Sequence, residues 1–193
     1  MDGLSSWMVI PAAFALDMLL GDPHRFPHPV RWMGRAIVAA EPWFRRLPVH
    51  PVLAGGGFAA VLVAGTWWLA ALLVDAGRSV QPLWASAIEI VMVYFCLSVR
   101  SLNDAAMEIF TLLAQHRAAD ARERLAWIVG RDVDRYQPHD MARGAVETVA
   151  ENFVDGVLSP LLFAALGGAP LAMACKMVST LDSMVGYKNE RYY

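Results

Sequence analysis

Residues 51–74 read PVLAGGGFAAVLVAGTWWLAALLV and contain no charged side chain at any position. A helix that crosses the hydrocarbon core of a bilayer needs about 20 predominantly apolar residues. This stretch is therefore the clearest membrane span of the sequence. The composition agrees, because 57% of the 193 residues are hydrophobic and only 18% are charged, a mixture that indicates a membrane protein. The length predicts a single membrane domain, 1–193.

Two further apolar stretches predict spans on either side of this one. Residues 79–99, SVQPLWASAIEIVMVYFCLSV, contain a single acid, Glu89. Residues 4–20, LSSWMVIPAAFALDMLL, are marginal in length and contain Asp17. An ionisable group inside a span is costly, so each acid is expected to have a partner or a function.

The distribution of arginine predicts how these spans are oriented. Five arginines lie in the loop 21–50 and seven in the polar region 100–155, whereas the short connection 75–78 carries one. Because cytoplasmic segments of membrane proteins are enriched in Lys and Arg, 21–50 and 100–155 are predicted to be cytoplasmic. The region 100–155 has helical periodicity with one apolar face, so we expect amphipathic cytoplasmic helices there.

The apolar segment 156–185 is interrupted midway by Gly167, Gly168 and Pro170. A straight crossing at this point would carry the downstream cations outside. A re-entrant pair of half-helices would keep them cytoplasmic, and such broken backbone is tolerated where protein or water satisfies it. We favour the re-entrant arrangement. The predicted fold class is therefore all-α: a polytopic integral membrane protein with amphipathic cytoplasmic helices and a re-entrant broken helix.

Several classes of function are disfavoured by what the sequence lacks. The net charge of −2 provides no basic field for nucleic acid. Cys96 and Cys175 both lie in apolar runs, so neither a disulfide framework nor a zinc site is predicted. The common phosphate-loop, dinucleotide, zinc-protease and serine-hydrolase motifs are absent, so any use of ATP involves a different phosphate-binding arrangement.

The stretch ETVAENFVDG, residues 147–156, contains a ladder of three acids at helical spacing, Glu147, Glu151 and Asp155, with the amide of Asn152 beside them. On a helix these acids lie opposite an apolar stripe made by Val146, Val149, Ala150, Phe153, Val154 and Val157. They are either a solvated face or a site for Mg²⁺, which binds one or two carboxylates together with substrate phosphates. A general base is a further possibility.

The stretch GDPHRFPHPVRWMG, residues 21–34, contains three prolines in seven positions, which predict a rigid extended loop. The side chains on this loop include Asp22, Arg25, His28 and Arg31, and arginine suits bidentate contact with a phosphate or a carboxylate. The alternative is a juxtamembrane loop whose arginines contact lipid head groups. His24 and His28 have the spacing of a helical metal pair, but Pro27 prevents a regular helix there.

Two more stretches carry clustered polar residues. LDSMVGYKNERYY, residues 181–193, places charges beside tyrosines directly after an apolar segment; its candidates are Asp182, Lys188, Asn189, Glu190 and Arg191. An aromatic belt with anchoring cations is the alternative. LAWIVGRD, residues 125–132, contributes Arg131, although a helix end followed by a turn would also explain it.

In this order the blocks LDMLLGDPHRFPHPVRWMGR, SVRSLNDAA, LAWIVGRD, ARGAVETVAENFVDGVLSPLLF and VSTLDSMVGYKNERY resemble the adenosylcobinamide-phosphate synthase family of cobalamin biosynthesis, the CobD/CbiB proteins. The resemblance implies a multi-pass protein of the bacterial inner membrane with its active face in the cytoplasm. It implies an ATP- and Mg²⁺-dependent ligase that joins (R)-1-amino-2-propanol phosphate, or ethanolamine phosphate, to adenosylcobyric acid. Family proteins continue past the NERY block, so we expect this chain to be C-terminally truncated.

The implied chemistry suits the residues singled out above. Mg²⁺ would be held by the acidic ladder. The catalytic candidates are Glu151, Asp182 and Glu190. The candidates for binding substrate or phosphate are Asp22, Arg25, His28, Arg31, Arg131, Asn152, Lys188, Asn189 and Arg191. The implied partners are adenosylcobyric acid, the amino-alcohol phosphate, the lipid bilayer and other cobalamin-biosynthesis enzymes, without nucleic acid. The alternatives are a membrane transporter or a corrinoid-binding scaffold without catalysis.

Overall fold

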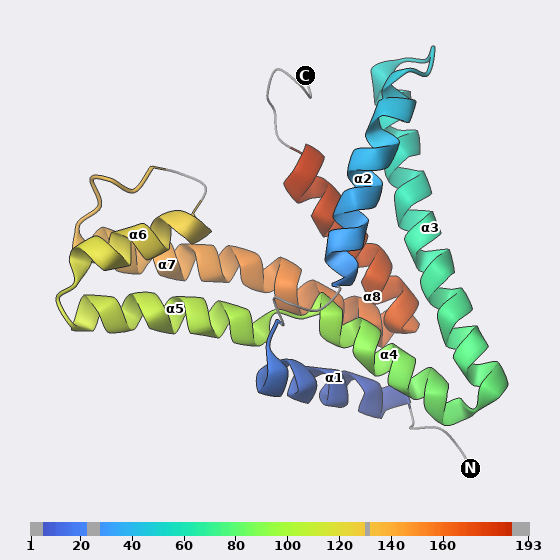
Figure 1. Cartoon of the computed structure of the whole chain (residues 1–193), viewed down its shortest axis with the longest axis horizontal. Helices are drawn as coiled ribbons and strands as arrows, with labels where there is room; N and C mark the ends of the chain where they lie inside the picture. Colours follow the sequence, from blue (N-terminus) through green and yellow to red (C-terminus); the bar gives the residue numbers. More distant parts are fainter. Residues whose placement is uncertain (1–5, 23–27, 130–131, 187–193) are drawn as a thin grey trace.

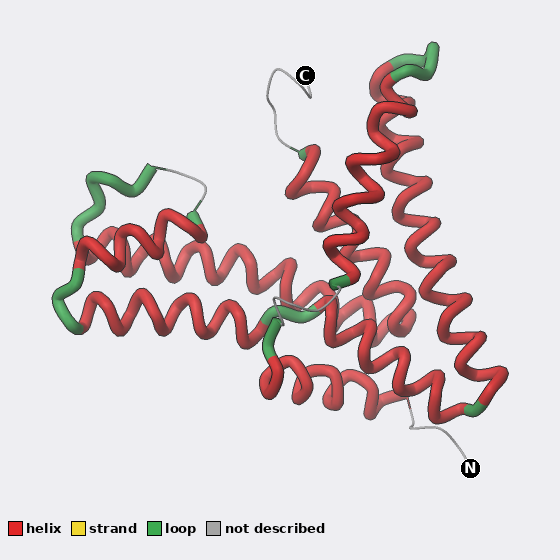
Figure 2. Tube along the Cα trace, in the orientation of Figure 1, coloured by secondary structure: helices red, strands yellow, loops and turns green. Residues whose placement is uncertain are grey.

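The computed structural model describes residues 6–22, 28–129 and 132–186, and all regular structure in these ranges is helical (Figures 1 and 2). The elements are α1 Ser6–Leu20, α2 Pro29–Arg45, α3 Pro51–Val80, α4 Pro82–Cys96, α5 Val99–Ala114, α6 Ala118–Ile128, α7 Pro138–Phe153, the π-helical turn η1 Val154–Leu158, and α8 Ser159–Val185. The described residues form no strand, which confirms the all-α prediction.

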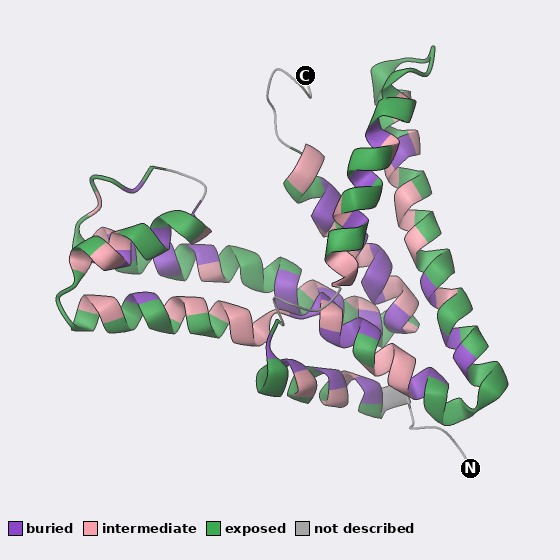
Figure 3. Cartoon of the chain, in the orientation of Figure 1, coloured by how far each residue is buried: buried purple, intermediate pink, exposed green. Residues whose placement is uncertain are grey.

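Three helical runs are long and apolar enough to cross a membrane: Pro51–Val80, Pro82–Ala114 and Pro138–Val185. Only 17% of the apolar window of the first run is buried within the chain, and Figure 3 shows α3 exposed along most of its length. A helix that is apolar and yet exposed is typical of one that faces lipid. The protein is thus an all-α, polytopic membrane protein.

The ends of the spans differ from those expected. α3 continues through 75–78, which had been predicted to be a connection, and the chain reverses at Gln81 in extended conformation. Proline disfavours helical backbone in the residue before it, so Pro82 places the turn at position 81. α1 has 15 residues, fewer than the roughly 20 that a straight crossing requires.

The segment 21–50 contains a helix where a loop was expected. Pro29, which had been taken to hold an extended loop, is instead the first residue of α2, where its missing N–H removes no helical hydrogen bond. Arg31 consequently lies on the first turn of a helix. The buried face of α2 is formed by Met33, Ile37 and Glu41, and this i, i+4, i+8 spacing is the signal that could have predicted the helix.

The helices pack around two separate cores. The larger core lies among α1–α4 and α8. It includes four residues that are 0% exposed, Ala13, Ile37, Val93 and Ala172. The smaller core joins α5, α6 and α7 and is centred on Leu125. Figure 1 shows these three helices side by side, extending away from the bundle. The region 100–155 therefore has its own packed interior.

The buried side of α7 is not the one predicted. Met141, Gly144, Ala145 and Thr148 face the smaller core, whereas most of the predicted stripe is exposed, with Val146 70% exposed. The small side chains at 144 and 145 allow α5 and α6 to approach closely, and Gly144 lies against Leu125 and Tyr136. Close packing at small residues has selected this face over the more hydrophobic one.

The predicted interruption of 156–185 is confirmed. α8 is broken at Gly167 (φ −149°, ψ 22°) and Gly168 (φ 70°, ψ −169°). The second conformation belongs to a region that is essentially restricted to glycine. A Cβ added at Gly168 would lie 3.6 Å from Glu89 Oε1. Glu89 and Gly168 also line a cavity of about 540 Å³ between α1, α4 and α8.

We expect Gly168→Ala to destabilise the protein by roughly 1–3 kcal/mol, because alanine does not readily adopt the backbone conformation at the break. Gly65→Ala is the matched control. Gly65 lies within α3 with open space where a Cβ would be, so alanine there should be neutral or slightly stabilising. Thermal unfolding of the detergent-solubilised variants measures both, and equal melting temperatures would contradict the role of the break.

The re-entrant arrangement of 156–185 remains a prediction and can be tested by cysteine labelling. In a background without Cys96 and Cys175, Ser183→Cys at the end of α8 should be labelled from the same membrane side as Asp134→Cys in the α6–α7 connection. Gln81→Cys, in the α3–α4 turn, should be labelled from the opposite side. Labelling of Ser183→Cys together with Gln81→Cys would instead establish a straight crossing.

Candidate functional site

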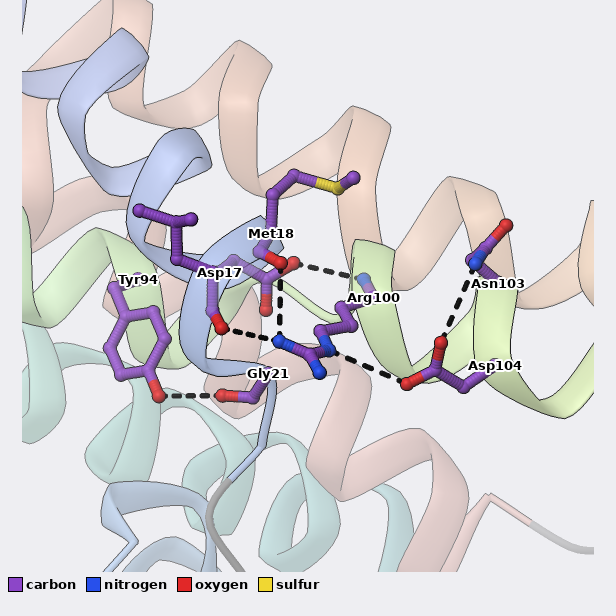
Figure 4. Close-up of polar contacts among 8 residues, drawn as sticks. Asp17, Met18, Gly21, Tyr94, Arg100, Asn103 and Asp104 are labelled. Atoms are coloured by element: carbon purple, nitrogen blue, oxygen red, sulfur yellow. Dashed lines mark hydrogen bonds and ion pairs between the residues drawn. The ribbon is translucent and has the colours of Figure 1, made fainter.

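The C-terminus of α1 and the N-terminus of α5 cap each other (Figure 4). The carboxylate of Asp17, 1% exposed, accepts a hydrogen bond from the backbone N–H of Arg100 at 3.1 Å and also interacts with the backbone of Val99. The N-cap residue Ser98 makes no side-chain cap of its own, and the carboxylate of Asp17, 83 positions before Arg100, takes that role. In return, the guanidinium of Arg100 donates to the carbonyl oxygens of Met18 and Leu19 at the end of α1.

Gly21 sets the direction in which the chain leaves this junction. Its φ of 64° is the left-handed conformation that favours glycine after a helix. The Tyr94 hydroxyl donates to the Gly21 carbonyl at 2.6 Å, in a buried contact (Figure 4). A Cβ at Gly21 would approach Arg100 Cδ to 3.0 Å. The junction therefore holds the start of the proline-containing segment against α4 and α5.

His28 caps α2 and lies beside Asp22. Its Nδ1 accepts the N–H of Val30 at 3.3 Å, its Nε2 is 3.5 Å from Asp22 Oδ1, and its ring packs edge-on against Phe95. Since Nδ1 accepts a hydrogen bond, the proton of the neutral ring is on Nε2, facing Asp22. Burial lowers the pKa of His28, and the positive charges of Arg31 and Lys176 lower it further, while Asp22 opposes them.

Lys176 is the cation that sequence reasoning missed as a site residue. It lies on α8, one helical turn beyond Met173, whose sulfur contacts Cys96 Sγ at 3.5 Å. Its positive charge contributes to lowering the pKa of His28, the N-cap residue of α2. A single half-buried cation after a long charge-free stretch was the available signal, since such a residue is expensive inside an apolar segment.

The π-helical turn η1 brings Asp155 to the same end of the bundle. The carbonyl of Gly156 accepts hydrogen bonds from Ser98, from the backbone N–H at 3.0 Å and from Oγ at 3.3 Å. A Cβ on Gly156 would collide with Ser98 Oγ, so glycine permits the close contact. Asp155 is near enough to Cys175 to act on it electrostatically. Such π-helical turns occur frequently at functional sites.

The acidic ladder is accessible, but it is not a preformed metal cage. Glu147, Glu151 and Asp155 are exposed, and the amide of Asn152 donates to Thr148 in its own helix at 2.9 Å. Among the described residues, no three His, Cys, Asp or Glu side chains gather closely enough to hold a metal ion. The ladder fits Mg²⁺ only in the form that uses one or two carboxylates and completes its shell with phosphate and water.

The structure thus places Asp22 beside His28, while the charges of Arg31 and Lys176 act on His28 and that of Asp155 acts on Cys175. Asp182 is exposed near the end of α8, and Glu147 lies two helical turns before Asp155. The remaining predicted site residues lie outside the described ranges: Arg25, Arg131, Lys188, Asn189, Glu190 and Arg191.

A second cavity, with a largely apolar lining, lies elsewhere. It has a volume of about 500 Å³ and is lined by α2, the start of α3 and the end of α8, including Phe44, Phe58 and Leu181. The buried carboxylate of Glu41 pairs there with Arg45 at 2.8 Å. The cavity and the polar cluster at His28 are therefore distinct features of the bundle.

The fold and the polar cluster define a class: a helical membrane protein with charged side chains gathered where its helices leave the apolar bundle. The chain belongs to the CobD/CbiB family, because the model of that family, described as CobD/Cbib protein, matches residues 10–193. No solved structure matches the chain.

Two curated relatives illustrate the similarity. The chain is 48% identical over 183 residues to the cobalamin biosynthesis protein CbiB of Salmonella paratyphi B, covering 93% of this chain and 57% of that protein. It is 44% identical over 192 residues to the cobalamin biosynthesis protein CobD of Klebsiella pneumoniae, covering 98% of this chain and 59% of that protein. The chain therefore spans under two thirds of the length of these relatives.

Proposed function

We propose that this protein acts in cobalamin biosynthesis as the ligase that forms adenosylcobinamide phosphate. The observation that carries the proposal is the convergence of Asp22, His28, Arg31 and Lys176 at one end of the bundle. The cations Arg31 and Lys176 of this set suit the phosphate groups of the reaction, and the relatives are named cobalamin biosynthesis proteins. The arginine distribution supports an inner-membrane location with this end facing the cytoplasm.

The reaction needs activation, because a carboxylate is a poor electrophile. In the proposed sequence, a carboxylate oxygen of adenosylcobyric acid attacks the γ-phosphorus of ATP, and the bond to ADP breaks. The amine of aminopropanol phosphate, having lost a proton to a base, attacks the acyl carbon and expels inorganic phosphate. Phosphoryl transfer of this kind depends mainly on positioning and on neutralising charge.

The proposed roles follow from side-chain chemistry. Mg²⁺ bound at the acidic ladder would neutralise charge on the ATP phosphates. Asp182 and Glu190 are the proposed bases for the attacking amine. The proposed phosphate and carboxylate contacts are Asp22, Arg25, His28, Arg31, Arg131, Asn152, Lys188, Asn189 and Arg191. Arginine suits this task because its planar fork donates two parallel hydrogen bonds.

A direct assay tests the proposal. Membranes containing the protein receive adenosylcobyric acid, ATP, Mg²⁺ and (R)-1-amino-2-propanol phosphate, and the corrinoids are analysed by mass spectrometry. We expect the amidated product, with ADP formed in equal amount. A longer relative, such as the Salmonella paratyphi B protein, provides the positive control. Failure of this chain beside an active relative would restrict the activity to the longer form; failure of both would refute the ligase.

One observation favours a second candidate, membrane transport. Glu89 lies at the break of α8 and lines a cavity there, and broken helices with intramembrane acids form substrate sites in transporters. Proteoliposomes distinguish the two: ATP-independent uptake of corrinoid without amidation supports transport. Retention of corrinoid without either uptake or amidation supports a binding scaffold.

A further inference from the structure

The position of Lys176 is determined by contacts on both sides of its helix turn. Met173, one turn earlier on the same face of α8, contacts Cys96 at the end of α4. Phe95, the neighbour of Cys96, contacts the ring of His28 with centroids 4.9 Å apart. Residues three apart on a helix share a face, so Lys176 lies on the side of α8 that meets the α4 terminus and the start of α2.

Lys176 differs from the other half-buried cations in the described part of the chain. Arg100 donates to backbone carbonyls of α1, and Arg122 donates to the Tyr136 carbonyl at 2.9 Å. The backbone carbonyl of Lys176 accepts a hydrogen bond from Thr180, but within the described residues its ammonium group has no hydrogen bond or ion pair, although the residue is half-buried. An ammonium group that gives up water without gaining an acceptor is unfavourable. An anionic ligand would supply the missing acceptor.

The surroundings indicate which anion. Arg31, on the first turn of α2, acts electrostatically on His28 as Lys176 does, and His28 places its Nε2 beside Asp22. Asp155 acts on Cys175, the residue before Lys176, from the neighbouring turn η1. A site with cations on one side and a carboxylate near the other fits a phosphate that also contacts a carboxylate-bound Mg²⁺. A ligand that carries only a carboxylate would not require the second carboxylate, Asp155, near the site.

We propose that the Lys176 ammonium binds a phosphate oxygen of a substrate and is the central cation of the phosphate subsite, a role that rests on the function proposed above. The shared chemistry is a phosphate oxyanion, which either the amino-alcohol phosphate or ATP could provide. Lys176 is thus a specificity-determining residue on the side of α8 that packs against the end of α4.

The test combines stability with binding. Purified protein in a neutral, phosphate-free detergent is titrated with (R)-1-amino-2-propanol phosphate, ATP or inorganic phosphate, and melting temperature and affinity are measured. The variants are Lys176→Met, which keeps the apolar stem, Lys176→Arg, which keeps the charge, and Arg46→Met, which removes an exposed cation at the far end of α2.

We expect ligand to raise the melting temperature of the wild type by mass action. Lys176→Met should bind about ten- to a hundredfold more weakly, as is typical when a hydrogen bond from a charged group is lost. Its melting temperature without ligand should be equal to or above that of the wild type, because an unpaired charge has been removed. Lys176→Arg should retain part of the affinity, and Arg46→Met should behave as wild type.

A purely structural lysine would lower stability and affinity together, and that result would overturn the proposal. So would wild-type affinity in Lys176→Met, or absence of phosphate binding by the wild type. The ligand that loses affinity, or whose KM rises during ligation, identifies the source of the phosphate. Lysine-dependent binding without ligation would refute the ligase and leave this site standing; ligation with unchanged KM and kcat in Lys176→Met would refute this site alone.

Discussion

Asp17→Ala is expected to destabilise the protein by roughly 1–3 kcal/mol, because the backbone N–H of Arg100 at the start of α5 loses its acceptor. The Asp17 carboxylate is 1% exposed, so water does not readily replace it. A change of this size lowers the melting temperature by about 2–12 °C in a protein of this length. Thermal unfolding in detergent, followed by tryptophan fluorescence, measures it.

Two further variants separate capping from charge. Asp17→Asn keeps one acceptor oxygen, and its expected loss is about 1 kcal/mol, typical of a weakened cap. Asp75→Ala removes an acid from the exposed Asp75–Arg78 pair on α3 and should change the melting temperature little, since exposed pairs contribute little. If Asp17→Ala melted within a degree or two of Asp75→Ala, the reciprocal capping of α1 and α5 would not be a significant source of stability.

Glu151→Gln is expected to abolish ligation, with kcat falling at least about a hundredfold, in line with the loss of a general base or a metal-binding carboxylate. The substitution removes one negative charge at nearly constant size. Glu151 is exposed, so its replacement should leave the melting temperature unchanged. The rate of formation of amidated corrinoid, measured over a range of Mg²⁺ concentrations, is the readout.

The form of the Mg²⁺ dependence distinguishes the two roles of Glu151. Loss of the Mg²⁺ response in Glu151→Gln indicates a metal ligand, whereas a low rate with an unchanged response indicates a base. Glu123→Gln, at an exposed acid on α6, is the control and should retain full activity. Undiminished turnover in Glu151→Gln would remove this residue from both roles and weaken the case for the acidic ladder.

The candidate site was predictable only in part. The sequence pointed to Asp22, His28 and Arg31 because prolines and charged side chains crowd a short segment, and the structure brings these residues together. Lys176 was missed, since its significance depends on α8 packing against the end of α4. The expected extended loop was wrong beyond Pro29, because a proline at a first helical position and one in a loop look alike in sequence.

The sequence by itself determined the helical class, the long apolar span in α3 and the break at Gly167–Gly168. These are local properties: the length of an uncharged run and the conformational freedom of glycine operate within neighbouring residues. Only the tertiary structure decided which face of α7 is buried and which groups cap α5. Asp17 and Arg100 are 83 positions apart, and no pattern along the chain connects them. Packing of the helices brings them together, because buried backbone N–H groups require an acceptor wherever the chain can supply one.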